Sequence, residues 1–74
     1  MNIEHFLNLL NNENAIEIIS TDVKNNIYHF NSNNKHYSLA KVNNIWELMN
    51  WELLDVIKCY KSNFGVIYNL YNDI

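Results

Sequence analysis

Asparagine governs where this chain can turn, because it takes the role that glycine and proline usually have. Sixteen of the 74 residues are asparagine, whereas the chain contains one glycine and no proline. Asparagine tolerates the left-handed backbone region, and its side chain caps helices. Asn pairs occur at positions 11–12, 25–26, 33–34 and 43–44. We therefore expect boundaries between structural elements at these pairs.

A chain of this length builds one domain around one small core. It is 49% hydrophobic and 14% aromatic, so it can fold rather than remain disordered. Cys59 is the only cysteine, which excludes an internal disulfide. We expect a single α+β domain over residues 1–74. Self-association or a tight partner could add stability that so small a core lacks.

Residues 2–12 are predicted to form a short amphipathic helix, because apolar side chains recur at helical spacing at Ile3, Phe6, Leu7 and Leu10. Asn2 is suited to the N-cap, Glu4 favours the positive end of the helix, and Asn14 could close the other end. Residues 15–21 are rich in β-branched side chains and predict a strand. The pattern leaves open which face of that strand is buried.

Residues 27–31 and 36–42 are predicted to form a β-hairpin around Asn33 and Asn34, since a two-residue type I′ turn needs positive φ at both central positions. The expected pairs are Ser32 with Lys35, Asn31 with His36, Phe30 with Tyr37, His29 with Ser38 and Tyr28 with Leu39. This register separates an apolar face from a polar one. The polar face would contain His29, Asn31, His36 and Ser38.

Residues 45–61 are predicted to form a second helix, capped by Asn43 or Asn44. Its apolar stripe comprises Trp46, Met49, Leu53, Val56, Ile57 and Tyr60. Residues 64–71 favour a strand by propensity, but a short helix is an open alternative. The expected fold is a three-stranded antiparallel sheet, four-stranded if residues 64–71 form a strand, packed against two helices in the order α-β-β-β-α-(β or α).

Trp51 is the predicted centre of a partner-binding site. On a continuous helix it lies roughly 180° from the apolar stripe, with Glu47 and Asp55 four residues to either side. Leu54 would lie nearby. An exposed Trp flanked by carboxylates suits a protein interface. Two alternatives remain open: residues 64–71 cover Trp51, or Asn50 breaks the helix and resets its phase.

We find no constellation for catalysis, for a metal or for a cofactor. His29 and His36 would lie diagonally on the polar hairpin face, within reach of one metal ion, but zinc sites normally need three or four protein ligands. Neither His5 nor Cys59 has a recognised ligand spacing, so we interpret the histidines as surface residues. Cys59 is expected to be a packed or boundary thiol near a helix end that disfavours a thiolate. We therefore predict a protein that is not an enzyme.

The charge and the hydropathy pattern indicate a cytoplasmic protein that binds neither nucleic acid nor membrane. The net charge is −3, with no arginine and five scattered lysines, whereas direct nucleic-acid binding needs a basic surface. No apolar run approaches the roughly 18 to 20 residues that span a bilayer, and no signal peptide is evident. The lone thiol fits a reducing compartment.

The composition also points to the source, since residues with A/T-rich codons dominate, as in phages, plasmids and low-GC bacteria. The chain begins Met1-Asn2-Ile3 on a helix, continues through Ile19-Ser20-Thr21-Asp22 into the sheet, and ends Tyr71-Asn72-Asp73-Ile74. In this layout it resembles small phage anti-CRISPR proteins, in particular Cas9 inhibitors with a helix, three strands and further helices from prophages of low-GC Gram-positive bacteria.

The resemblance implies a non-enzymatic inhibitor that evades host defence by occupying a site on a host protein, with a CRISPR-Cas effector as a candidate target. The chain is far less acidic than those inhibitors, so none of their contact residues is carried over. The alternative from another class is a homo-oligomeric structural or regulatory module, in which an exposed strand edge and the Trp51 surface form a homodimer.

Overall fold

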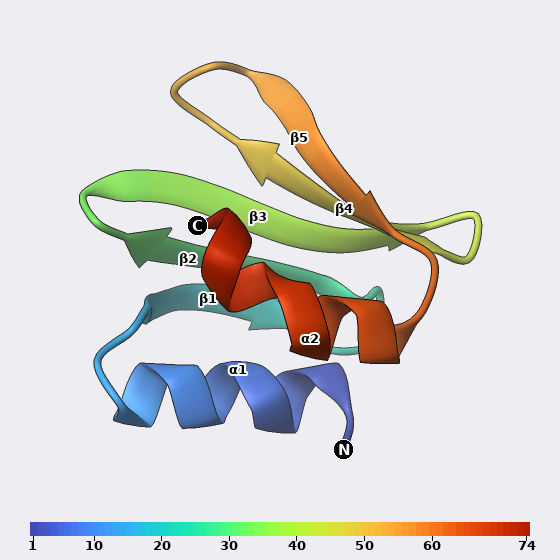
Figure 1. Cartoon of the computed structure of the whole chain (residues 1–74), viewed down its shortest axis with the longest axis horizontal. Coiled ribbons are helices and arrows are strands. Elements are labelled where there is room, and N and C mark those ends of the chain that lie inside the picture. The colour runs from blue at the N-terminus through green and yellow to red at the C-terminus, as the bar shows by residue number, and fades with distance from the viewer.

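Two helices flank five consecutive strands in the computed structural model, which describes all residues from 1 to 74 (Figure 1). The chain begins with α1 (Ile3–Asn12) and ends with α2 (Asn63–Asp73). Between them lie β1 (Glu17–Asp22), β2 (Ile27–Ser32), β3 (Lys35–Val42), β4 (Ile45–Asn50) and β5 (Asp55–Tyr60). Each strand pairs antiparallel with the next, so the sheet has the order β1-β2-β3-β4-β5.

The α+β class with two helices and an antiparallel sheet is confirmed, but the predicted strand count was too low. Residues 45–61 form β4, a turn and β5 rather than a helix. The physical reason is the Asn43–Asn44 pair, in which both residues adopt positive φ, 51° and 66°. They make a tight hairpin turn instead of capping a helix. Residues 64–71 belong to α2, so the helical alternative is the correct one there.

The first hairpin forms in the predicted register. Asn33 and Asn34 have φ values of 52° and 64°, as a type I′ turn requires. All five expected residue pairs between β2 and β3 are present. The predicted N-terminal helix is also confirmed, and the Asn2 side chain accepts a hydrogen bond of 2.8 Å from the backbone N–H of His5.

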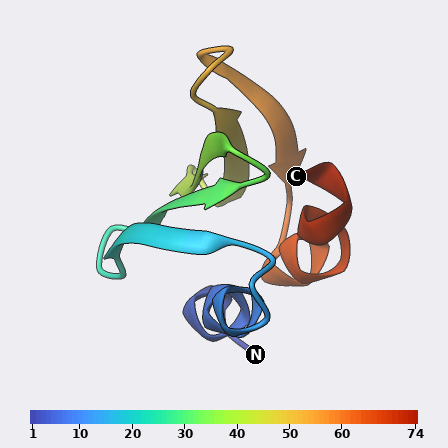
Figure 2. The ribbon, with the colours of Figure 1, turned by 90° about the vertical axis from the view of Figure 1, so that its left-hand side faces the viewer.

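Both helices lie on one side of the sheet, which curves around them (Figure 2). α1 packs beside β1, and α2 packs beside β5 and against α1. The core between the helices and the sheet is apolar, and its fully buried members include Leu7, Phe30, Leu39, Leu48, Val66 and Leu70. Neither helix is long and apolar enough to cross a bilayer.

Side-chain hydrogen bonds fasten α2 to the sheet at both ends. At its beginning, the indole N–H of Trp46 on β4 donates to the Asn63 amide oxygen at 2.7 Å. The Ser62 hydroxyl caps the helix by accepting from the N–H of Gly65. At its end, the Tyr60 hydroxyl donates to the Asp73 carboxylate at 2.6 Å. These bonds keep α2 on the same side of the sheet as α1 and leave the opposite side uncovered.

Candidate functional site

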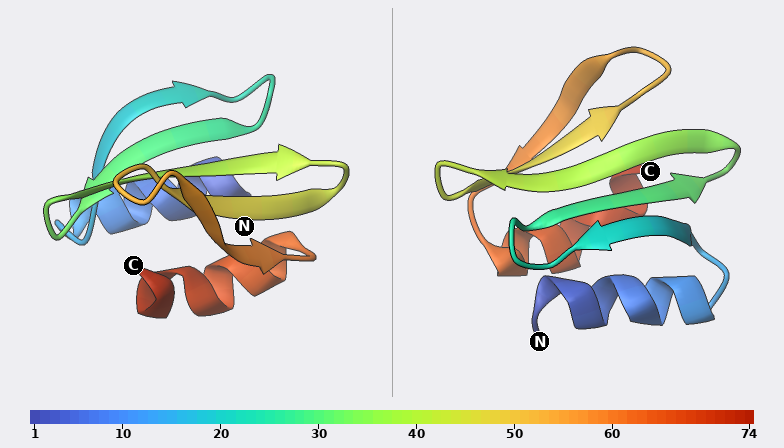
Figure 3. Two further views of the ribbon diagram at one scale, coloured as in Figure 1. Left: turned by 90° about the horizontal axis from the view of Figure 1, so that it is seen from above. Right: turned by 180° about the vertical axis from the view of Figure 1, so that it is seen from behind.

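The side of the sheet opposite the helices, which we call the open face, is the first candidate surface (Figure 3, right). Strand alternation sends Tyr28 and Phe30 into the core and His29 and Asn31 to the open face. The pairing register extends this face across β3, β4 and β5. Several apolar side chains on the open face are between 37% and 44% exposed, namely Ile27, Val42, Ile45 and Val56. Apolar strand residues thus face solvent without a covering element.

Trp51 lies over the open face directly after β4 ends. Its backbone N–H donates to the carbonyl of His36 at 2.9 Å, which continues the pairing with β3 by one residue. Its indole N–H donates to the hydroxyl of the buried Ser38 at 3.0 Å. The Trp51 side chain remains 39% exposed. One part of the indole is therefore fixed to the sheet, while the rest is available to a partner.

Two histidines lie next to the indole. The Trp51 ring centroid is 5.7 Å from that of His29 and 5.9 Å from that of His36. His29 Nδ1 and His36 Nε2 are 3.1 Å apart, within hydrogen-bond distance. Partial burial, and secondarily the charge of His36, lower the pKa of His29 below its ordinary value. The pair therefore favours at least one neutral imidazole.

Hydrogen bonds within the turn between β4 and β5 fix the position of Trp51. The Asn50 side-chain oxygen accepts from the backbone N–H groups of Glu52 and Leu53, at 2.9 Å and 3.1 Å. The Glu52 carboxylate accepts from the backbone N–H of His36 at 3.0 Å and 3.1 Å. Leu54 completes the turn with a φ of 54°. Leu53 and Leu54 project into solvent, 67% and 70% exposed, and we call them the hairpin tip.

The predicted site residues lie on three different surfaces. Trp51 and Glu47 share the open face, and Glu47 lies opposite Ala40 and Cys59. Leu54 lies at the hairpin tip. Asp55 pairs with Asn50, whose side chain is on the helix-facing side of the sheet. The helical spacing that grouped these four residues does not exist, because β4 and β5 replace the helix.

Trp51 is partly exposed, but it follows a strand and does not lie on the outer side of a helix as predicted. α2 does not cover the indole, and Asn50 ends β4 instead of breaking a helix, so neither alternative describes the surroundings of Trp51. The contacts of Trp51 with Ser38, His29 and His36 were not predicted. The diagonal placement of the two histidines on the polar hairpin face was predicted correctly. Cys59, expected to be packed or at a boundary, is exposed on β5, because its pairing with Glu47 places it on the open face and away from the helices.

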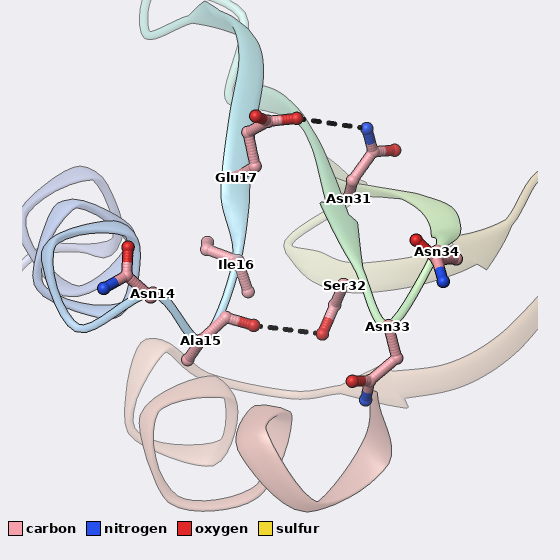
Figure 4. Close-up of a pocket in the computed structure, with 8 residues that line it drawn as sticks. All are labelled: Asn14, Ala15, Ile16, Glu17, Asn31, Ser32, Asn33 and Asn34. Carbon is pink, nitrogen blue, oxygen red and sulfur yellow. Dashed lines mark hydrogen bonds between the residues drawn. The ribbon is translucent and has the colours of Figure 1, made fainter.

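A second feature is a polar depression of about 510 Å³ between the α1–β1 connection and the β2–β3 turn (Figure 4). The Ser32 hydroxyl donates to the Ala15 carbonyl at 3.1 Å, and the Asn31 amide reaches Glu17 at 3.5 Å. Glu17 is the only ionisable residue in its lining. Two of its polar contacts are thus made within the lining itself, between β1 or the segment before it and β2.

An aromatic stripe on the outer side of α2 is the third exposed feature. Phe64, Tyr68 and Tyr71 are each more than 60% exposed, and the Phe64 and Tyr68 rings are 4.6 Å apart. Because α2 covers the other side of the sheet, this stripe does not continue the open face.

The fold and the site define a small α+β protein with a five-stranded antiparallel meander, two helices on one face and an aromatic–histidine cluster on the other. The chain matches no family model, and neither a curated protein nor a solved structure gives a significant match.

Proposed function

We propose that the protein is a non-enzymatic inhibitor from a phage or mobile element that binds and blocks a host protein through its open face and hairpin tip. The observation that supports this most directly is the uncovered sheet face, on which Val42 and Ile45 remain exposed beside one another. Exposed apolar patches around a fixed Trp are typical of protein interaction sites.

The size of the surface argues for including the hairpin tip. By ordinary strand spacing, five strands of about six residues give a face of roughly 24 Å by 20 Å, or about 500 Å². Stable complexes usually bury about 800 Å² on each partner. The open face alone falls short of that area. Leu53 and Leu54 extend it beyond the sheet, so a partner that also covers the turn reaches the usual size.

The charges on the open face indicate the chemistry of the partner. The register places Glu17, Asp22 and Glu47 on this side of the sheet. The strand lysines Lys35, Lys41 and Lys58 pair with residues of the helix-facing side instead. An apolar centre with acidic and no basic strand positions complements a host surface that is apolar and basic. Nucleic-acid-binding sites of host proteins have basic surfaces, and a CRISPR-Cas effector is therefore the first target class to test.

The test compares two arginine substitutions at partly exposed apolar positions. Val42→Arg puts a positive charge on the open face, whereas Leu9→Arg puts the same charge on α1, where Leu9 is 38% exposed. Purified Cas9-type effectors from low-GC Gram-positive bacteria are mixed with each variant and assayed for co-elution and for target-DNA cleavage. We expect wild type and Leu9→Arg to bind and inhibit, and Val42→Arg to do neither.

The outcome that contradicts the surface assignment is a folded Val42→Arg variant that binds as well as wild type. Trp51→Ala is also expected to lose partner capture. Because it additionally removes the bond to Ser38, circular dichroism and thermal melting must accompany it. If no effector binds, the CRISPR-Cas target class is wrong. The same variants then identify a partner of the open face in host lysate, as a protein that is retained by wild type and by Leu9→Arg but not by Val42→Arg.

A second candidate function is that of a homodimeric interaction module. It is favoured by β5, an edge strand that pairs with β4 on one side only and carries Val56 and Ile57, which are 39% and 37% exposed. Edge-to-edge pairing of two copies would satisfy its free backbone groups. Light scattering distinguishes the two: the homodimer requires twice the 8.9 kDa chain mass at micromolar concentration, and Ile57→Lys should restore the monomer. A wild-type monomer contradicts this function.

A further inference from the structure

The His29–His36 pair has the geometry of two ligands to one metal ion. Their facing ring nitrogens, Nδ1 of His29 and Nε2 of His36, are 3.1 Å apart. Two nitrogens bound to one ion at about 2.05 Å lie about 2.9 Å apart at a right angle and about 3.3 Å apart at the tetrahedral angle. The observed separation falls between these limits. An ion can therefore take the place of the proton between the rings, once both rings rotate so that their lone pairs point at the ion instead of along the line between the nitrogens.

The two rings are held in place from several sides before any ion binds. Antiparallel pairing of β2 with β3 fixes them diagonally, with Asn31 opposite His36 and Ser38 opposite His29. The Trp51 indole lies within 6 Å of both rings, measured between centroids. The Glu52 carboxylate holds the backbone of His36. Ligands on paired strands with supporting contacts lose little freedom on binding, which favours a defined site.

The ligand set determines which ions can bind. Two neutral imidazoles suit late first-row transition metals, whereas Mg²⁺ and Ca²⁺ require oxygen ligands. No group of three or more His, Cys, Asp or Glu side chains converges in the structure. Water or an added small ligand must fill the remaining positions. Such an open site follows the general affinity order, in which Cu²⁺ binds more tightly than Ni²⁺ or Zn²⁺.

We propose that His29 and His36 together bind one late first-row divalent transition-metal ion, Cu²⁺ in preference to Zn²⁺, on the open face beneath Trp51. This site is independent of the proposed inhibitor function, since its ligands and geometry come from one chain alone. The sequence predicted two separate surface histidines, because it offers only two candidate ligands. The paired geometry of His29 and His36 is the additional observation.

Cu²⁺ titration of the purified protein tests the site, with fluorescence and calorimetry as readouts. Trp51 lies against both ligands, whereas Trp46 is buried on the other side of the sheet. Bound Cu²⁺ should quench the Trp51 emission saturably at one ion per chain, and Trp51→Phe should abolish the quenching while calorimetric binding persists. EDTA should reverse both signals.

His5→Ala is the matched control, because His5 is an exposed histidine on α1, away from the open face. We expect it to bind Cu²⁺ as wild type does, whereas His29→Gln and His36→Gln each weaken binding at least about tenfold. Circular dichroism establishes that each variant is folded. If one of the two glutamine variants does not fold, the other one alone tests the site. The proposal is overturned if folded His29→Gln or His36→Gln binds normally, if His5→Ala alone abolishes binding, or if wild type shows no saturable one-to-one binding.

Discussion

The indole N–H of Trp51 donates to the hydroxyl of Ser38 at 3.0 Å, and this bond joins the β4–β5 turn to the middle of the sheet. Without it, the indole would be free to rotate away from His29 and His36. The bond thus couples a local turn to the arrangement of the open face. The buried Ser38 hydroxyl accepts a hydrogen bond from a partly exposed side chain. Its role is therefore to hold Trp51 in place on the open face and not to pack the core.

Ser38→Ala should lower the free energy of unfolding by about 1 kcal/mol, because it removes the acceptor of this bond. Trp51→Phe keeps an aromatic ring over the histidines and removes the donor. In a double-mutant cycle measured by urea denaturation, we expect a coupling of about 0.5 to 1.5 kcal/mol between the two positions. Strictly additive effects would show that the bond does not form in solution.

The two Asn pairs at 33–34 and 43–44 explain why β1 to β3 were predictable from sequence whereas β4 and β5 were not. Both pairs have positive φ and both make hairpin turns. The first was interpreted as a turn because strand alternation on both sides agreed with it. The second was followed by residues 45–61, whose apolar positions fit helical spacing as well as alternation. Short apolar segments are ambiguous by periodicity alone, although the second Asn pair suits a hairpin turn as well as the first does.

The second turn can be tested directly at Asn44, which has a φ of 66°. Asn44→Ala should destabilise the protein by about 1 kcal/mol, since a Cβ without a compensating side chain is strained in the left-handed region. Asn44→Gly should be neutral or stabilising, because glycine adopts this conformation without strain. Thermal melting of the two variants distinguishes the hairpin from a helix cap, because at a cap glycine would also cost a few tenths of a kcal/mol relative to asparagine. Only the hairpin lets Asn44→Gly match or exceed the wild-type Tm. A Gly variant less stable than the Ala variant would contradict the hairpin.

The candidate site was only partly predictable, because it depends on pairings between distant residues. Placing Trp51 above Ser38 requires the β3–β4 register, which a helical interpretation of residues 45–61 cannot supply. By contrast, the diagonal placement of His29 and His36 follows from the first turn alone. Sequence therefore located one half of the cluster, and the nonlocal contact that completes it came from the fold.

Alkaline pH should weaken the attachment of α2 through Tyr60. Burial, and then the hydrogen bond and charge of Asp73, raise the pKa of Tyr60 well above its ordinary value. Because the folded pKa exceeds the unfolded one, this contribution is fully present below about pH 10 and is lost as the pH rises toward the folded pKa. Stability should therefore fall above about pH 10.

Tyr60→Phe isolates this effect. We expect it to lower the free energy of unfolding at pH 7 by about 1 to 2 kcal/mol, through loss of the bond to Asp73, and to flatten the alkaline dependence. Tyr71→Phe is the control, because Tyr71 is exposed and should change neither value. Urea denaturation at a series of pH values measures both. An unchanged alkaline slope in Tyr60→Phe would assign the loss to another group.

Leu54, at the hairpin tip, has both a strained backbone conformation and an exposed side chain. A leucine with a φ of 54° and 70% exposure contributes little to the core and occupies a conformation that glycine prefers. Leu54→Gly should therefore raise stability by about 1 kcal/mol, seen as a higher Tm. If the tip binds the host partner as proposed, the same variant should bind more weakly although it is more stable, which is the pattern expected where strain is retained for function. A stabilised Leu54→Gly variant with full affinity would remove the hairpin tip from the proposed interface and leave only the open face.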